Sequence, residues 1–258
     1  MDLEVETVTM SPLFLLTLLV FLGGYIGSLM SGGSLLVFSG LTFLDMPVKV
    51  RIGTLKFLIT VLALFSAITY LKGKAVNVRL APSLVFPSII GSFLGAKIIL
   101  FLPDNVVNIV VAFLLFTGVV FTLKLESKMA PGIMGIEAKG GILPILAGML
   151  VGVYIGMLGI ASTILTISIL VALFRFKLLI ANGTAKMIIF ANNLVACAIY
   201  GFYDSVDFFI GSLMSIPIAI GAWAGAKTAL KIRSSTLKII FIAMAAITII
   251  KLLSEIIW

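Results

Sequence analysis

Residues 12–44 read PLFLLTLLVFLGGYIGSLMSGGSLLVFSGLTFL, a stretch of 33 residues without a charged side chain. A helix that crosses a bilayer needs only about 20 apolar residues, so this stretch is too long for one simple span. Near its middle lies Ser31-Gly32-Gly33-Ser34, a cluster of small residues of the kind that breaks helices. The stretch therefore predicts a full helix, an irregular turn and then a half-helix of about 11 residues.

The composition indicates a membrane protein. Of its 258 residues, 62% are hydrophobic and 11% are charged, whereas a soluble domain has about 45–50% apolar and about 25% charged residues. Long apolar runs recur, and the short alternating segments of a transmembrane barrel are missing. We predict an all-α, multi-pass protein of the cell membrane. Its apolar segments are 12–44, 50–71, 80–101, 104–123, 141–174, 180–202, 206–230 and 235–254.

The two halves of the chain match in sequence. The polar linker ESKMAPGIMGIEAKGG at 125–140 separates a first membrane repeat, 1–124, from a second, 141–258. We predict an internal duplication into homologous halves of about four spans each, a feature of secondary transporters. The positions that coincide when 130 is subtracted include Gly183, Thr184 and Lys186 with Gly53, Thr54 and Lys56, and Pro217, Gly221, Gly225 and Lys227 with Pro87, Gly91, Gly95 and Lys97.

The relative orientation of the halves is left open by the sequence. The second half has its own long stretch, 141–174, broken by Gly159-Ile160-Ala161-Ser162-Thr163. Four crossings per half would make the repeats parallel, with eleven Lys and Arg in the loops of one side, seven on the other and both termini outside. If each broken segment turns back on itself, the repeats are inverted.

The polar residue types exclude several functions. The chain has no histidine and one cysteine, and its ten acidic residues fall at or near the ends of apolar runs. These absences argue against a metal site, a Ser-His-Asp triad and a carboxylate proton relay within the membrane. We therefore expect no catalytic residues, no metal and no cofactor, and we do not expect an enzyme. The net charge of +8 fits membrane orientation and anionic lipid better than nucleic acid.

The two breaks are candidate anion sites. A half-helix that begins at Ser34 or Thr163 exposes unpaired N–H groups and a positive dipole end. An anion at that place would satisfy these donors, whereas the alternative is a kink that lets two helices pack closely. The candidate binding residues are Gly32, Gly33, Ser34, Ser162 and Thr163.

The Gly-Thr-x-Lys elements add a second set of candidates: Gly53, Thr54, Lys56, Gly183, Thr184 and Lys186. We expect each glycine to interrupt a helix and each threonine to cap its continuation. Neither lysine has a carboxylate three or four residues away, so each either faces a substrate or snorkels to lipid phosphates. Asn193 shares a helical face with Lys186 and, with Asn192, either lines a cavity or links helices.

The Pro-x3-Gly-x3-Gly-Ala-Lys strings have a different interpretation. Gly91 and Gly95 are four residues apart on one helical face, as are Gly221 and Gly225. This spacing predicts close packing between helices, with the lysine that follows each string at the membrane interface.

The order of these features resembles the sulfite exporter TauE/SafE family, also called TSUP, over about residues 12–254: two halves of roughly four spans, a glycine-rich break in each first span and a Gly-Thr-x element in the second. The resemblance implies a transporter of small sulfur-containing anions such as sulfite, sulfoacetate or thiosulfate, or of other organic anions. The family pattern at the first break is usually richer in glycine than Ser-Gly-Gly-Ser, and the second copy departs further, which leaves the exact substrate open.

The sequence thus predicts a secondary transporter of small anions that works by alternating access where the halves meet, with the lipid bilayer as its surroundings. A passive anion channel and a non-transporting membrane scaffold or assembly protein are the alternatives. The chain lacks the acidic groups that an intramembrane enzyme or a retinal-type Schiff-base protein would need. Transport direction, coupling ion and oligomeric state, including a homodimer, are left open.

Overall fold

The computed structural model describes residues 12–103, 105–107, 109–110, 113, 142–160, 162–233, 235–236 and 239–240. The predicted linker 125–140 lies outside the described residues, as do most of the apolar segments 104–123 and 235–254. The division into repeats at these boundaries stays a prediction. The helices are α1 (Pro12–Leu29), α2 (Gly33–Leu41), α3 (Val48–Lys72), α4 (Ala81–Phe101), α6 (Ile142–Met157), α7 (Ser162–Phe174), α8 (Leu178–Phe202) and α9 (Phe208–Lys231).

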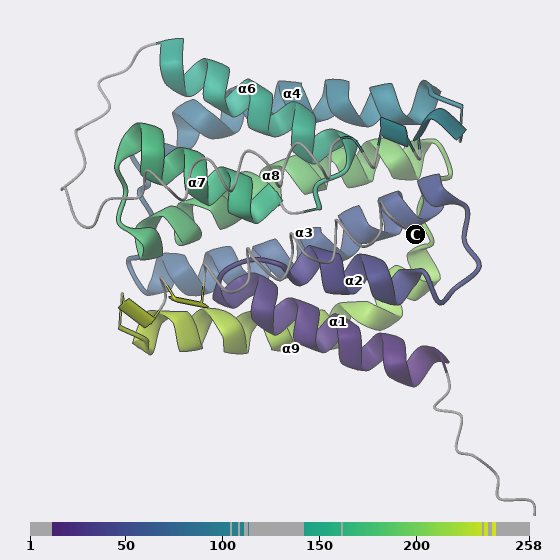
Figure 1. Cartoon of the computed structure of the whole chain (residues 1–258), viewed down its shortest axis with the longest axis horizontal. Coiled ribbons are helices and arrows are strands. Elements are labelled where there is room, and N and C mark those ends of the chain that lie inside the picture. The colour runs from purple at the N-terminus through teal and green to yellow at the C-terminus, as the bar shows by residue number, and fades with distance from the viewer. Residues whose placement is uncertain are drawn as a thin grey trace, which may run out of the picture.

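The helices lie side by side along one direction (Figure 1). Four of them, α3, α4, α8 and α9, are long and apolar enough to cross a membrane. Large apolar side chains cover their outer faces, as Phe86 and Ile90 do on α4 and Ile216 on α9, which are between 59% and 69% exposed. The expected class, an all-α multi-pass membrane protein, is confirmed.

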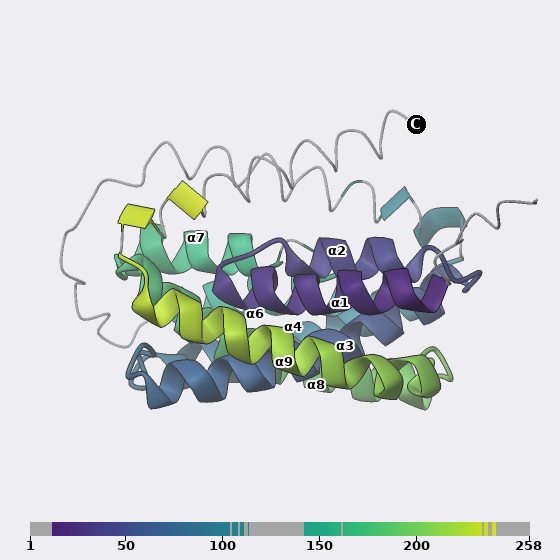
Figure 2. The ribbon, with the colours of Figure 1, turned by 90° about the horizontal axis from the view of Figure 1, so that it is seen from below.

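Both long apolar stretches are broken at a glycine with positive φ. Gly32 has φ 88° between α1 and α2, and Gly159 has φ 76° between α6 and α7. Glycine adopts this left-handed conformation without the steric cost that a Cβ imposes. After the first break α2 runs back along α1, because Val37 lies against Gly23 and Gly40 lies against Leu16. The broken segment is therefore a helical hairpin (Figures 1 and 2).

The matched helices α3 and α8 lie against each other in opposite directions. A Cβ added at Gly53, near the start of α3, would overlap the carbonyl oxygen of Ser205, just after α8. A Cβ at Gly183, near the start of α8, would overlap the carbonyl oxygen of Ala75, just after α3. The described helices of the two halves are thus inverted relative to one another, and the parallel arrangement that four crossings per half would give is wrong.

The first helix of each half packs on the last long helix of the other half. A Cβ at Gly225 of α9 would overlap the carbonyl oxygen of Tyr25 in α1, and a Cβ at Gly95 of α4 would overlap that of Val153 in α6. These contacts confirm the close packing predicted from the glycine spacing. The pairs α1–α9 and α4–α6 flank the central α3 and α8 (Figure 1).

Replacing Gly95 with valine should destabilise the protein by about 1–3 kcal/mol, because the added methyl groups force α4 away from α6. Thermal unfolding in detergent measures the effect. The control is Leu94→Val, next along the helix, where the leucine side chain is 41% exposed. Equal unfolding temperatures for the two variants would contradict the close α4–α6 contact.

Candidate functional site

The carbonyls at the end of α1 are bonded by side chains from the two central helices. The last four carbonyls of a helix lack partners within it. Lys186 Nζ donates to the carbonyl oxygen of Gly27, and the Tyr70 hydroxyl donates to that of Ser28 at 2.8 Å. Asn182 Nδ2 donates to the Leu29 carbonyl at 3.0 Å and to the Tyr70 hydroxyl at 2.8 Å. Three successive carbonyls thus find donors inside an apolar bundle.

The end of α6 is capped by the matching residues. Lys56 Nζ donates to the carbonyl oxygen of Ile155, and the Tyr200 hydroxyl donates to that of Met157 at 3.2 Å. The position that corresponds to Asn182 is Ile52, which has no polar group to contribute. Each lysine therefore caps the broken helix of the half to which it does not belong.

Both lysines are fully buried, with 0% of Lys56 and of Lys186 exposed. They do not snorkel to lipid phosphates. Among the described residues, the acidic side chains of Asp45 and Asp204 are exposed and that of Asp207 is half-buried, all at the ends of helices. The positive charge is held by carbonyls at helix C-termini, where the helix dipole favours a cation.

The glycine and threonine of each Gly-Thr-x-Lys element have a different role from the one expected. Helices α3 and α8 run without interruption through Gly53 and Gly183, so the predicted helix break at these glycines is wrong. A helix tolerates an internal glycine where a neighbouring backbone approaches closely, which is what both glycines allow.

The threonine hydroxyls hold loops of the opposite half. Thr54 Oγ1 accepts a hydrogen bond from the backbone N–H of Asp207 at 2.9 Å, and Thr184 Oγ1 accepts one from the N–H of Asn77 at 3.0 Å. The N–H groups that they satisfy lie in the loops that lead into α9 and α4, so each threonine fixes the entry of a long helix.

The two elements lie at different depths. Gly53 lies near the start of α3, and Gly183 lies against Ala75, just after the end of α3. With a rise of about 1.5 Å per residue, the chain from Gly53 to Ala75 separates the two glycines by roughly 30 Å along α3. The same rise places Lys56 and Lys186 roughly 20 Å apart along this direction. Figure 1 shows α3 and α8 side by side. The two Gly-Thr-x-Lys elements therefore do not meet at one point.

The breaks gather the remaining predicted residues. Gly32, Gly33 and Ser34 lie at the start of α2 and are buried, and Ser162 and Thr163 begin α7. A Cβ at Gly159 would come within 2.8 Å of Lys56 Nζ and 3.7 Å of Asn193 Oδ1, which brings Lys56 and Asn193 to the second break. The Asn193 amide also donates to the Ile189 carbonyl at 2.8 Å.

Sequence reasoning left several residues out of the site. Tyr70, Tyr200 and Asn182 cap the broken helices, and the match of Tyr200 with Tyr70 at the offset of 130 was the available signal. The Ser31 hydroxyl and both polar atoms of the Asn192 amide are buried without a hydrogen-bond partner. Ser31 directly precedes the turn into α2, so it offers an unused polar group at the first break.

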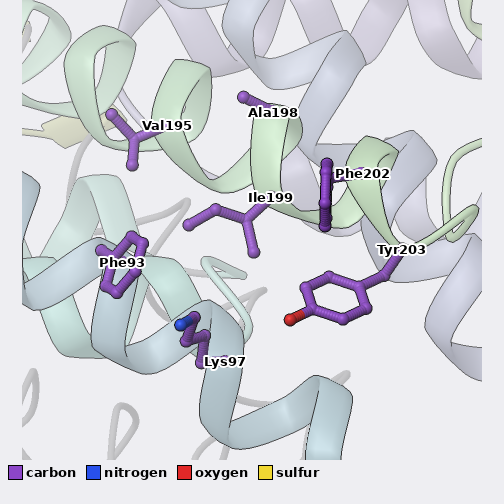
Figure 3. Close-up of a pocket in the computed structure, with 7 residues that line it drawn as sticks. All are labelled: Phe93, Lys97, Val195, Ala198, Ile199, Phe202 and Tyr203. Carbon is purple, nitrogen blue, oxygen red and sulfur yellow. The ribbon is translucent and has the colours of Figure 1, made fainter.

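A hollow of about 400 Å³ lies elsewhere, between α4 and α8 (Figure 3). The Lys97 ammonium sits over the Phe93 ring at 4.6 Å, and none of the predicted site residues lines this hollow. Among the described residues no cluster of three or more acidic, cysteine or histidine side chains could hold a metal ion. The lining residues of the hollow are Phe93, Lys97, Val195, Ala198, Ile199, Phe202 and Tyr203.

Inverted halves whose first helices break inside the bundle, with polar groups gathered at the breaks, are the architecture of secondary membrane transporters. The chain belongs to the sulfite exporter TauE/SafE family, whose family model matches residues 16–252. It is a membrane transporter of this family.

Two relatives are similar over most of their length. A probable membrane transporter protein, ORF9, of Sinorhizobium sp is 23% identical over 239 residues, which cover 91% of this chain and 90% of the relative. A probable membrane transporter protein of Haemophilus influenzae is 26% identical over 211 residues, with 80% and 81% covered. No solved structure matches the chain significantly.

The double variant Thr54→Val/Thr184→Val should lose about 1–3 kcal/mol of stability per site, because each change leaves a loop N–H without its acceptor. Thermal unfolding in detergent measures the loss. The control Thr54→Ser/Thr184→Ser keeps both hydroxyls and should unfold near the wild-type temperature. A valine variant as stable as the serine variant would show that the loops do not depend on these bonds.

Proposed function

We propose that this transporter moves small sulfur-containing or other organic anions, sulfite-like in size and charge, across the cell membrane by alternating access where its two halves meet. The observation that carries the proposal is the full burial of Lys56 and Lys186 beside the two helix breaks, without a buried carboxylate among the described residues. Two buried positive charges in an apolar bundle attract anions and repel cations.

The breaks supply the donors for an anion. The first turns of α2 and α7 start inside the bundle, so their N–H groups and positive dipole ends point toward the breaks. The free Ser31 hydroxyl adds a donor at the first break, and the Ser162 hydroxyl lies at the second. Sulfite presents three oxygens, which suit several N–H and hydroxyl donors together with one ammonium.

The lysines connect substrate binding to movement of the halves. Each ammonium bonds a carbonyl of the opposite half, so it holds the two halves together across their interface. A charged oxygen is a stronger acceptor than a carbonyl. An anion at a break draws the ammonium from the carbonyl, which loosens the contact between the halves when substrate is present.

Replacing Lys56 or Lys186 with glutamine should lower sulfite flux into proteoliposomes by about ten- to a hundred-fold, since a hydrogen bond to a charged group contributes about 1.5–3 kcal/mol. Labelled sulfite uptake per amount of folded protein is the measurement. Glutamine keeps an N–H donor but removes the positive charge, so the variant tests the charge more than the loss of a donor.

The matched controls are Lys97→Gln and Lys227→Gln, because these lysines also correspond at the offset of 130 but their ammonium groups lie over the rings of Phe93 and Trp223. The controls should retain most of the flux. Wild-type flux in both buried-lysine variants would remove the lysines from the transport site.

Exchange measurements separate a carrier from the alternatives. Unlabelled sulfite inside the vesicles should accelerate entry of labelled sulfite, because a carrier returns faster when it is loaded, whereas a passive channel shows no acceleration. Sulfite at about 100 times its Kd should also stabilise the protein by about 2.7 kcal/mol. A protein that neither transports nor is stabilised by sulfite, thiosulfate, sulfate, sulfoacetate or simple carboxylates would be a scaffold.

A further inference from the structure

The two ends of the helix bundle differ in charge. One end, here called the positive end, is where α3 and α9 finish and α4 and α8 begin. The hydrogen bond from Asn77 N–H to Thr184 joins the start of α8 to the loop after α3, and Gly73 lies against Leu230 near the end of α9. Figure 1 shows these turns together at one end of the bundle.

Among the described residues, eight exposed cations surround the positive end, and no acidic residue accompanies them. They come from three separate segments: the α3–α4 turn, the α7–α8 turn and the end of α9. Their convergence depends on the hairpin turn after each helix break. The cations are Lys72, Lys74, Arg79, Arg175, Lys177, Lys227, Lys231 and Arg233.

The opposite end, here called the aromatic end, is neutral among the described residues. Its three cations, Lys49, Arg51 and Lys97, are half-buried, and three acids, Asp45, Asp204 and Asp207, balance them. Exposed rings are concentrated there, including Phe202 at 83% and Phe209 at 77% exposure. The exposed aromatic residues of this end are Phe14, Phe43, Phe101, Phe202, Tyr203, Phe208 and Phe209.

We propose that the positive end faces the cytoplasm and rests on the anionic phospholipid headgroups of the inner leaflet, with the aromatic end on the outer side. Lys and Arg in short loops near span ends are retained on the cytoplasmic side, and acidic residues have little influence. Anionic lipid of that leaflet attracts exposed cations within a Debye length of its surface. The proposal does not depend on which substrate is transported.

The orientation assigns a side to each helix break. Lys186 lies in the part of α8 nearer the positive end, so the α1 break that it caps is on the cytoplasmic side of the bundle's middle. Lys56 lies nearer the aromatic end, which places the α6 break on the outer side. Helix α1 then begins at the outer side.

Single-cysteine labelling tests the orientation. The chain's one cysteine, Cys197, is buried and is replaced by serine as the background. Arg79→Cys and Asp45→Cys place exposed thiols at the two ends. In bacterial membrane vesicles treated with a membrane-impermeant maleimide, Asp45→Cys should label at least about ten-fold more in right-side-out vesicles, and Arg79→Cys in inside-out vesicles.

A second pair, Lys177→Cys and Phe43→Cys, protects the test against a variant that fails to fold. The reverse labelling pattern would overturn the proposal, and so would labelling of both ends from the same side of the membrane. The same pattern in both pairs would support it.

The lipid contact has its own measurement in bilayer discs. Replacing phosphatidylcholine with phosphatidylglycerol should raise the unfolding temperature of the wild type. The rise should be smaller for Lys74→Gln/Arg79→Gln than for the control Lys49→Gln/Lys97→Gln, which removes two cations from the aromatic end. Equal rises in the two double variants would overturn the contact between the positive end and anionic lipid.

Discussion

The structure depends on how carbonyl groups are satisfied where α1 and α6 stop inside an apolar bundle. Lipid tails offer them no hydrogen-bond donor there, and an unpaired buried carbonyl costs about 1–3 kcal/mol. Lys186, Tyr70 and Asn182 supply donors at one break, and Lys56 and Tyr200 supply them at the other. Because these donors come from α3 and α8, the two helices must occupy the centre, and the broken helices must lie against them.

The same arrangement interlocks the halves. Helix α1 packs on α9 and α4 packs on α6, each through glycines that bring two backbones into contact. A rigid-body movement of one half against the other would have to disturb these contacts, the threonine bonds to the opposite loops and the lysine caps together. In another movement, the hairpins α1–α2 and α6–α7 would shift against the central α3–α8 pair, each together with its partner, α9 or α4. This movement would keep the glycine contacts of α1 with α9 and of α6 with α4 intact. In such a movement the lysine caps would lie at the sliding surface.

Local pattern was a good guide where one residue decides a local conformation. Gly32 and Gly159 adopt positive φ within the two predicted breaks. The local pattern gave the wrong prediction at Gly53 and Gly183. A glycine can end a helix or allow a neighbouring backbone to approach it closely, and the sequence does not distinguish these two roles. The interpretation of Thr54 as a helix cap failed with it, since its partner, the N–H of Asp207, is 153 residues away. The lysines could be assigned to lipid or protein only once their burial was known.

The sequence by itself determined that the chain is a helical membrane protein, where its first spans break, and which residues of one half correspond to those of the other. These properties follow from hydrophobic length, small-residue clusters and matching strings, all of which are local or periodic. Tertiary structure decided that the described helices of the halves are inverted, that each lysine caps the other half's broken helix, and that eight cations of the described residues gather at one end. Each of these rests on the direction the chain takes after Gly32 and Gly159, and that direction is set by contacts between helices distant in the sequence.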